Sequence, residues 1–247
     1  MAKPNGVVIY QGPSQIDGQT IAVIVTGIGK ASRNEKTGDM LQTWIIRDDV
    51  APNIAVHMGA DASVCGDCKH RGTIVNGRNV NRSCYVTVGR APRQVYLAYR
   101  KGNYPVALAH QIADCAVGRV VRLGSYGDPA AVPLWVWEAF TSKALTWTGY
   151  THQWRNCSPD YARYCMASVD TACEQIAAKM QGYRTFRVRA ANEDLAAREI
   201  VCPASEEAGK RTSCADCRAC GGLSAKARVD IAIMPHGLGK GNFRKAA

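Results

Sequence analysis

The sequence lacks any run of about eighteen uninterrupted apolar residues, which is the length that a membrane helix needs. Its first six residues, Met-Ala-Lys-Pro-Asn-Gly, also lack the apolar core of a secretory signal. No Pro/Ser-rich linker divides the 247 residues. We therefore expect a protein of the reducing cytoplasm without a membrane partner. We expect residues 1–50 to form a β-rich N-terminal cap in the same globule as a main domain at 51–247.

A concentrated basic tract is absent too, although 31 Lys and Arg against 20 Asp and Glu give a formal charge of +11. Such an excess attracts polyanionic neighbours over long range but says little about the fold. Because the positive residues are spread along the chain, solvated surface is their usual role. Nucleic acid is retained as an alternative partner on net charge alone.

Cysteine, in contrast, is plentiful: the chain has eleven, an odd number. Disulfides are rare in a reducing cytoplasm, so this density favours metal or redox chemistry over covalent crosslinks. Seven of the cysteines fall into two spaced sets, treated below. We expect the other four to be small buried apolar residues, since free cysteine is often buried. They are Cys115, Cys157, Cys165 and Cys173.

The most informative motif is Cys202-Pro203 followed by Cys214, Cys217 and Cys220. Three cysteines spaced by two residues, with a remote Cys-Pro, resemble the way bacterial ferredoxins hold a cubane cluster. A single tetrahedral zinc would use this crowded triplet poorly. We expect a closed [4Fe-4S] site with four thiolate ligands, and a structural zinc knuckle is the alternative.

A second set consists of Cys65, Cys68 and Cys84. Three thiolates leave one position on iron or zinc for water, a substrate or another ligand, which is typical of sites that perform chemistry. The neighbouring candidates for a fourth protein ligand are His57, Asp61, Asp67 and His70. The sequence does not choose among them. A zinc site with mixed Cys and His ligands is the alternative.

Short apolar or β-branched segments predict strands at 54–58, 95–99, 120–125, 145–150, 165–169, 185–189, 199–202 and 229–234. Helices are predicted at 133–144, at 171–181 with Gly182 as its stop, and at 193–198. In the first fifty residues, 21–26 and 43–47 resemble a hairpin. Alternating strands and helices predict a mostly parallel sheet. We expect a complete or partial β/α barrel of the TIM type, with an open doubly wound sheet as the alternative.

Polar side chains follow several of the predicted strands. In α/β barrels and open α/β sheets, ligands bind at the carboxyl ends of the strands. We therefore expect both cysteine sets at one such rim, together with Asp128 and His152. Asp128 either belongs to a simple turn or binds a cationic amine or orders a cluster ligand. His152 is either a hydrogen-bonded structural residue or a ligand or proton donor.

Eight segments, in order along the chain, resemble the phage "gene product 88" family. They are Lys-Thr-Gly-Asp-Met at 36–40, Cys-Gly-Asp-Cys at 65–68, Cys-Tyr-Val at 84–86, Tyr-Gly-Asp-Pro at 126–129, Trp-Thr-Gly-Tyr-Thr-His at 147–152, Met-Ala-Ser-Val-Asp at 166–170, Tyr-Arg-Thr-Phe-Arg-Val at 183–188 and Cys-Pro-Ala-Ser-Glu at 202–206. The resemblance implies a viral protein in the cytoplasm of an infected bacterium. It implies no defined activity.

A more distant likeness is to radical S-adenosylmethionine enzymes, which carry a three-cysteine cluster on the rim of a partial barrel. This chain departs from their compact C-x3-C-x2-C pattern, because Cys84 stands apart from Cys65 and Cys68.

Three functional hypotheses follow. The first is a protein with two [4Fe-4S] clusters that exchanges electrons with a redox partner or small-molecule substrate. The second adds S-adenosylmethionine at an open iron, which makes the protein a radical enzyme. The third is a basic zinc protein that binds nucleic acid.

Overall fold

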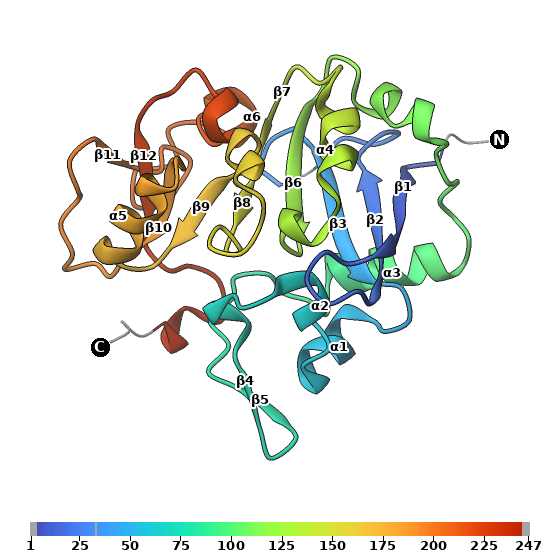
Figure 1. Ribbon diagram of the computed structural model, residues 1–247, viewed down its shortest axis with the longest axis horizontal. Coiled ribbons are helices and arrows are strands. Elements are labelled where there is room, and N and C mark those ends of the chain that lie inside the picture. The colour runs from blue at the N-terminus through green and yellow to red at the C-terminus, as the bar shows by residue number, and fades with distance from the viewer. Residues whose placement is uncertain (1–3, 33, 244–247) are drawn as a thin grey trace.

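Two five-stranded sheets form the framework of the computed structural model, which describes residues 4–32 and 34–243 (Figure 1). The first sheet has the order β1 (Gly6–Pro13), β2 (Thr20–Thr26), β3 (Leu41–Arg47), β6 (Val120–Tyr126) and β7 (Thr146–Thr148). The second has the order β11 (Glu199–Val201), β12 (Asp230–Ile233), β10 (Thr185–Val188), β9 (Met166–Val169) and β8 (Tyr150–Thr151). A separate hairpin, β4 (Thr73–Val75) and β5 (Arg78–Val80), projects from the body (Figure 1).

Most of the strand pairs are parallel, which confirms the predicted α/β class. In the first sheet β1, β2 and β3 are antiparallel, whereas β3, β6 and β7 run parallel. Every pair in the second sheet is parallel. The N-terminal strands continue the first sheet, because β3 pairs directly with β6. The predicted hairpin of 21–26 and 43–47 corresponds to the antiparallel pair β2 and β3.

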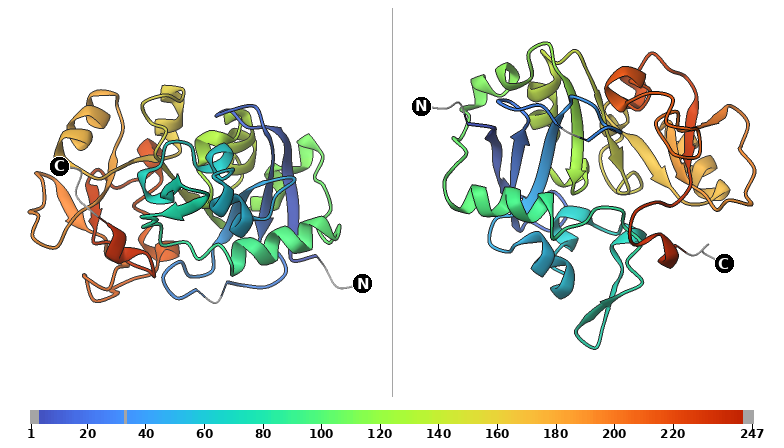
Figure 2. Two further views of the ribbon diagram at one scale, coloured as in Figure 1. Left: turned by 90° about the horizontal axis from the view of Figure 1, so that it is seen from below. Right: turned by 180° about the vertical axis from the view of Figure 1, so that it is seen from behind.

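The α-helices lie in the connections and cover the sheets. They are α1 (Pro52–Met58), α2 (Ala62–Cys65), α3 (Ala91–Arg100), α4 (Leu134–Thr141), α5 (Ala172–Met180) and α6 (Cys214–Cys217). Helix α4 lies in front of the first sheet in Figure 1, and the view from behind in Figure 2 shows α3 on the other side. Helix α4 buries Trp137 and Phe140 in the main core, while α5 packs on β9 and β10. Among the described residues, no helix is long and apolar enough to cross a membrane.

Three secondary-structure predictions were wrong. The segment 54–58 lies in α1, which has a proline in its first turn and ends at Gly59 with a left-handed φ of 78°. The segment 95–99 lies in α3, which buries Pro92, Val95 and Tyr96 at helical spacing. Short apolar runs fit a strand or a buried helix equally well, so the terminal signals decide. The segment 193–198 has no helix.

Candidate metal centre

A cavity of about 490 Å³ lies between the two sheets and is lined by residues of both cysteine sets. Alternate residues along several strands point into it, as expected for one face of a pleated sheet. They include Gln42 and Trp44 of β3, Arg122, Gly124 and Tyr126 of β6, Tyr150 of β8, Ser168 of β9, Phe186 and Val188 of β10 and Ile233 of β12. The cavity therefore spans the two sheets.

Cys65, Cys68 and Cys84 line one part of this cavity. Cys65 ends the short helix α2, and Cys68 and Cys84 lie in the chain on either side of the projecting hairpin. The loop of Cys68 and the loop of Cys84 are held together by the backbone of His70, whose carbonyl accepts from the N–H of Cys84 at 2.9 Å. Fifteen residues separate Cys68 from Cys84 in the sequence, and the hairpin between them brings their two loops together.

The three thiols influence one another. Burial raises the pKa of Cys65, and the charges of Asp61, Cys68 and Cys84 raise it further. Burial raises the pKa of Cys68 as well, and Cys84 acts in the same direction. Since the thiolate is the form that binds metal, a bound cation would offset the cost of ionising these thiols.

Asp128 connects the segment of Cys65 to the segment of His152. Its backbone N–H donates to the carbonyl of Val64, which precedes Cys65, and its carboxylate accepts from the N–H groups of Ala130 and His152 at 2.9 and 2.7 Å. Burial raises the pKa of Asp128 to about 6. Both carboxylate oxygens therefore accept hydrogen bonds from backbone N–H groups. Asp128 thus positions His152 beside the Cys65 loop.

The four fourth-ligand candidates named from the sequence differ in their surroundings. His57 and Asp67 are exposed and lie outside the cavity lining. Asp61 is buried, but Arg71 pairs with it at 2.7 Å. His70 lines the cavity, yet one ring nitrogen contacts Asp170 at 2.9 Å and the other contacts Ser83 at 2.8 Å. Each of the four is thus exposed or already engaged.

His152 differs from the four candidates, although Tyr126, Arg71 and Arg82 in the same lining also have a buried side-chain atom without a hydrogen bond in the described part of the chain. Nε2 of His152 is buried and has no hydrogen-bond partner among the described residues. Its ring stands edge-on to that of His70, with 5.7 Å between the ring centroids. Burial lowers the pKa of His152 to about 4, and the charge of His70 acts in the same direction. A neutral imidazole with a free nitrogen is the form that binds a metal.

The second set packs against the concave face of the second sheet. Cys202 follows β11, and Cys214 and Cys217 are the ends of α6, whose N-cap Ser213 accepts from the N–H of Asp216. Cys202 and Cys220 belong to a buried apolar group with Met166, Ile231 and Ile233. Burial raises the pKa of Cys220 to about 12, and the other three cysteines of the set act in the same direction. Cys214 and Cys217 pack against the same apolar group, so all four cysteines belong to one packed cluster.

The two cysteine sets differ in where they lie relative to the strand ends, and Cys202 of the second set directly follows β11. The Cys65 loop is bonded to Asp128, just after β6, and so lies at the carboxyl end of that strand. In contrast, the N–H of Cys214 donates to Lys36, before β3, and the carbonyl of Cys220 accepts from Gly149, before β8. The loop 203–213 carries the chain from the end of β11 back along the sheet. Figure 1 accordingly shows α6 and α2 on opposite sides of the molecule.

Basic side chains line the cavity beside the second set. Nζ of Lys36 lies 3.3 Å from Nε2 of His236, and Nη2 of Arg122 donates to the hydroxyl of Tyr85 at 2.7 Å. Burial lowers the pKa of Lys36; Cys202 and Cys214 oppose this shift and Arg122 adds to it. Burial and the charge of Lys36 lower the pKa of His236. Lys36 and Tyr85 belong to sequence motifs, but the motifs did not predict that they would lie beside Arg122 and His236.

Of the four remaining cysteines, Cys165 is fully buried as expected, and Cys115 and Cys157 are half-buried. Cys173 is exposed in α5, so the prediction was wrong for that residue. Within residues 4–32 and 34–243, no three His, Cys, Asp or Glu side chains converge on a point where one metal ion could bind. In a cubane each cysteine binds a different iron.

Comparisons of the chain with protein-family models, with curated proteins and with solved structures give no match. The resemblance to the phage family therefore stays a prediction from the sequence motifs.

Proposed function

We propose that this protein is a phage-encoded iron–sulfur protein that holds two [4Fe-4S] clusters on opposite sides of one cavity. The observation that carries the proposal is that Cys65, Cys68 and Cys84 line the same cavity as Cys202 and Cys214. Two redox groups that face a common space are suited to exchange electrons with a small molecule or a partner that reaches it. The resemblance to the phage family makes the infected bacterial cytoplasm the expected setting.

The donor set at the second site suits a closed cluster. The four cysteines belong to one packed cluster, and three of them come from one short segment around α6. The surrounding side chains are mostly apolar, which limits the access of water to a cluster. Cys202, Cys214, Cys217 and Cys220 would hold the group, which supplies one-electron transfer when it is bound.

The first site has three thiols, and we propose His152 as its fourth protein ligand. Support comes from the free, buried Nε2 of this residue and from its place in the cavity lining. Asp128 holds the backbone of His152 and the Cys65 loop in fixed relation. Residues that hydrogen-bond to a metal ligand, without binding the metal themselves, orient that ligand.

We also propose that the two sheets form an open β/α barrel. Only Gly149 separates β7, at the edge of the first sheet, from β8, at the edge of the second. Alternate strand residues from both sheets line one cavity. A parallel barrel presents its inward residues in this way.

A radical S-adenosylmethionine enzyme is the second candidate. It is favoured by the same three-thiol set, provided that His152 does not bind the cluster and one iron position stays open to the cavity. Formation of 5′-deoxyadenosine by the reduced protein supplied with S-adenosylmethionine would support it. An unchanged spectrum of the reduced cluster without that product would remove it.

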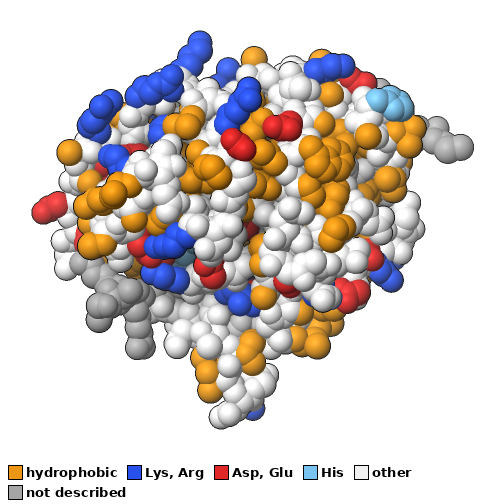
Figure 3. Space-filling model, viewed as in Figure 1, with side chains coloured by type: hydrophobic (Ala, Val, Ile, Leu, Met, Phe, Trp, Pro, Cys, Tyr) orange, Lys and Arg blue, Asp and Glu red, His pale blue; other side chains and the backbone are white. Residues whose placement is uncertain are grey.

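A zinc protein that binds nucleic acid is the third candidate, favoured by the net charge of +11. Figure 3 draws the face of the molecule seen in Figure 1. Lys and Arg side chains are densest along its upper left edge, with acidic side chains interspersed. Colourless protein with stoichiometric zinc and steeply salt-dependent DNA binding would support this candidate, because phosphate contacts release counterions.

The decisive experiment is metal and sulfide analysis of protein purified without oxygen. We expect a brown protein with about eight irons and about eight acid-labile sulfides per chain. Cys217→Ser should lose roughly half of both, because it removes one ligand of the second site only. The matched control is Cys173→Ser, an exposed cysteine outside both sets, which should keep the full content. A preparation without acid-labile sulfide would contradict the proposal.

A further inference from the structure

Arg122 is a buried cation whose acidic neighbour is the thiol of Cys214 rather than a carboxylate. The residue is 9% exposed, and its guanidinium contacts only the hydroxyl of Tyr85, at 2.7 Å, and the ring of Tyr150, with 5.8 Å to the centroid. No carboxylate in the described part of the chain forms an ion pair with it. A buried charge is costly unless it is paired.

The other buried arginines, in and beside β10 of the second sheet, have more partners, although Nε of Arg184 and Nε of Arg189 are buried without a hydrogen bond in the described part of the chain. Arg187 pairs with Glu199, and Arg189 pairs with Glu207. Arg184 donates to three backbone carbonyls, those of Ala219, Gly222 and Val229. Arg122 differs from them because it lines the cavity and its guanidinium, with five N–H donors, makes one side-chain hydrogen bond, to Tyr85.

Lys36 adds a second basic side chain to the part of the cavity wall that Arg122 lines. It lines the cavity, and its Nζ contacts His236 rather than a carboxylate. Its acidic neighbour Glu206 is exposed and pairs instead with Lys210. This part of the wall therefore combines the permanently charged guanidinium of Arg122, the amine of Lys36 and the phenol of Tyr85.

The shape and size of the cavity suit a small molecule. About 490 Å³ is within the range of pockets that bind small ligands. Tyr150 and Phe186 pack with 4.5 Å between ring centroids, and Tyr85 stacks on His236 at 5.0 Å, so the basic wall is flanked by aromatic rings. The planar fork of an arginine matches the two oxygens of a carboxylate or a phosphate.

We propose that Arg122 and Lys36, with the hydroxyl of Tyr85, bind the phosphate or carboxylate group of a small anionic ligand in this cavity. Tyr85 directly follows Cys84 and Lys36 is bonded to the segment of Cys214, so the ligand would lie between the two cysteine sets. The inference goes beyond the proposed function, since it does not depend on which metal the cysteines hold.

The test is a calorimetric titration of the oxygen-free protein with inorganic phosphate, adenosine 5′-monophosphate and benzoate. We expect at least one probe to bind, and the choice between phosphate and carboxylate identifies the group. Arg122→Gln should weaken that binding by roughly tenfold to a hundredfold, the usual effect of losing hydrogen bonds to a charged group. Lys36 lies in a loop and is less important for folding. Lys36→Gln should also weaken the binding of that probe.

Arg119→Gln is the control for non-specific attraction, because it removes the same charge from a partly exposed position that pairs with Asp39. It should leave the affinity unchanged. The proposal is overturned if no probe binds the unmodified protein, or if Arg122→Gln and Arg119→Gln behave alike. Iron and sulfide are measured on the same samples, and affinities are compared at equal iron content. Protein that lacks sulfide but binds the anion would contradict the proposed function alone.

Discussion

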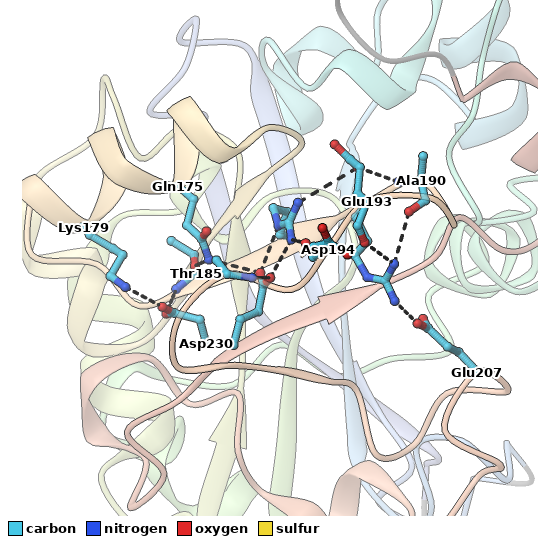
Figure 4. Close-up of polar contacts among 12 residues, drawn as sticks. Gln175, Lys179, Thr185, Ala190, Glu193, Asp194, Glu207 and Asp230 are labelled. Carbon is cyan, nitrogen blue, oxygen red and sulfur yellow. Dashed lines mark hydrogen bonds and ion pairs between the residues drawn. The ribbon is translucent and has the colours of Figure 1, made fainter.

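At the scale of single residues, the ion pair between Arg187 and Glu199 is central to the second sheet (Figure 4). Both side chains are almost fully buried, and Nη2 of Arg187 lies 2.6 Å from Oε2 of Glu199. The carboxylate also accepts from Gln175 of α5 and from the N–H of Ala196. The pair therefore joins β10, β11, α5 and the irregular loop between the two strands.

We predict that Glu199→Gln lowers the free energy of unfolding by about 3–5 kcal/mol, because it leaves the buried charge of Arg187 with only the longer ion pair to Glu193, at 4.0 Å. Chemical denaturation at neutral pH measures this loss. The control is Asp114→Asn, which breaks an ion pair with Lys143 in which both side chains are more than half exposed. Exposed pairs contribute little, so the control should stay near the unmodified protein. Equal effects of the two substitutions would contradict the prediction.

At the scale of elements, Glu174 connects α5 to the first cysteine set. Thr171 caps the helix by accepting from the N–H of Glu174, and the carboxylate of Glu174 accepts from the N–H of Asp170 at 2.8 Å. The same carboxylate pairs with Lys69 at 2.7 Å and with Arg155 at 3.0 Å. Lys69 follows Cys68 directly, so the start of α5 is linked to the loop of that cysteine.

This linkage predicts a pH dependence. Burial acts to raise the pKa of Glu174, but Lys69, the N–H of Asp170 and Arg155 outweigh it, so the pKa is lowered from the ordinary 4.5. A carboxyl group with a lowered pKa stabilises the fold above its ordinary pKa, and this contribution is lost as the pH falls through the lowered value. Glu174→Gln should therefore be less stable than the unmodified protein at pH 7.

The difference between the two proteins should shrink as the pH falls through the lowered pKa of Glu174, below which both carry a neutral side chain. Denaturation curves of both proteins at pH 7 and at about pH 3 measure this, because comparing the two cancels other acid effects, including the loss of metal. A difference that is constant across this range would show that Glu174 acts through packing and hydrogen bonds alone.

At the scale of the whole molecule, Gly149 is the joint between the two sheets. Its N–H donates to the carbonyl of Cys220, and its own carbonyl accepts from the N–H of Met166. A Cβ atom at this position would lie 2.9 Å from Sγ of Cys165 and from the carbonyl oxygen of Tyr164. Such approaches are too close, so the atoms around this position would have to shift to admit a methyl group.

We predict that Gly149→Ala destabilises the protein by about 1–3 kcal/mol, the usual cost of overpacking a core. If the second site holds the proposed cluster, this substitution should also lower the iron content, because the backbone of Cys220 is held by Gly149. Thermal unfolding and iron analysis measure the two effects. Gly89→Ala is the control, since no atom lies within 4 Å of the added methyl group. Unchanged unfolding of Gly149→Ala would show that the two sheets move independently.

The sequence by itself determined the α/β class, six of the eight predicted strands and the helices α4 and α5. These elements carry strong local signals, such as a continuous β-branched run or the stop at Gly182, whose φ is 84°. The sequence also predicted two cysteine sets from C-x2-C spacing, which is a local property, and their role as metal ligands stays a prediction. It failed for α1 and α3, where short apolar runs hid the helical period.

Only the tertiary structure decided how these parts meet. It separated His152, with its free nitrogen, from His57 and His70, a distinction set by neighbours distant in sequence. It placed α6 away from the rim that the Cys65 loop occupies, because a long loop returns along the sheet. It also brought Lys36, Arg122 and His236 to one wall. Such groupings depend on contacts across the whole chain, which local patterns of residues do not encode.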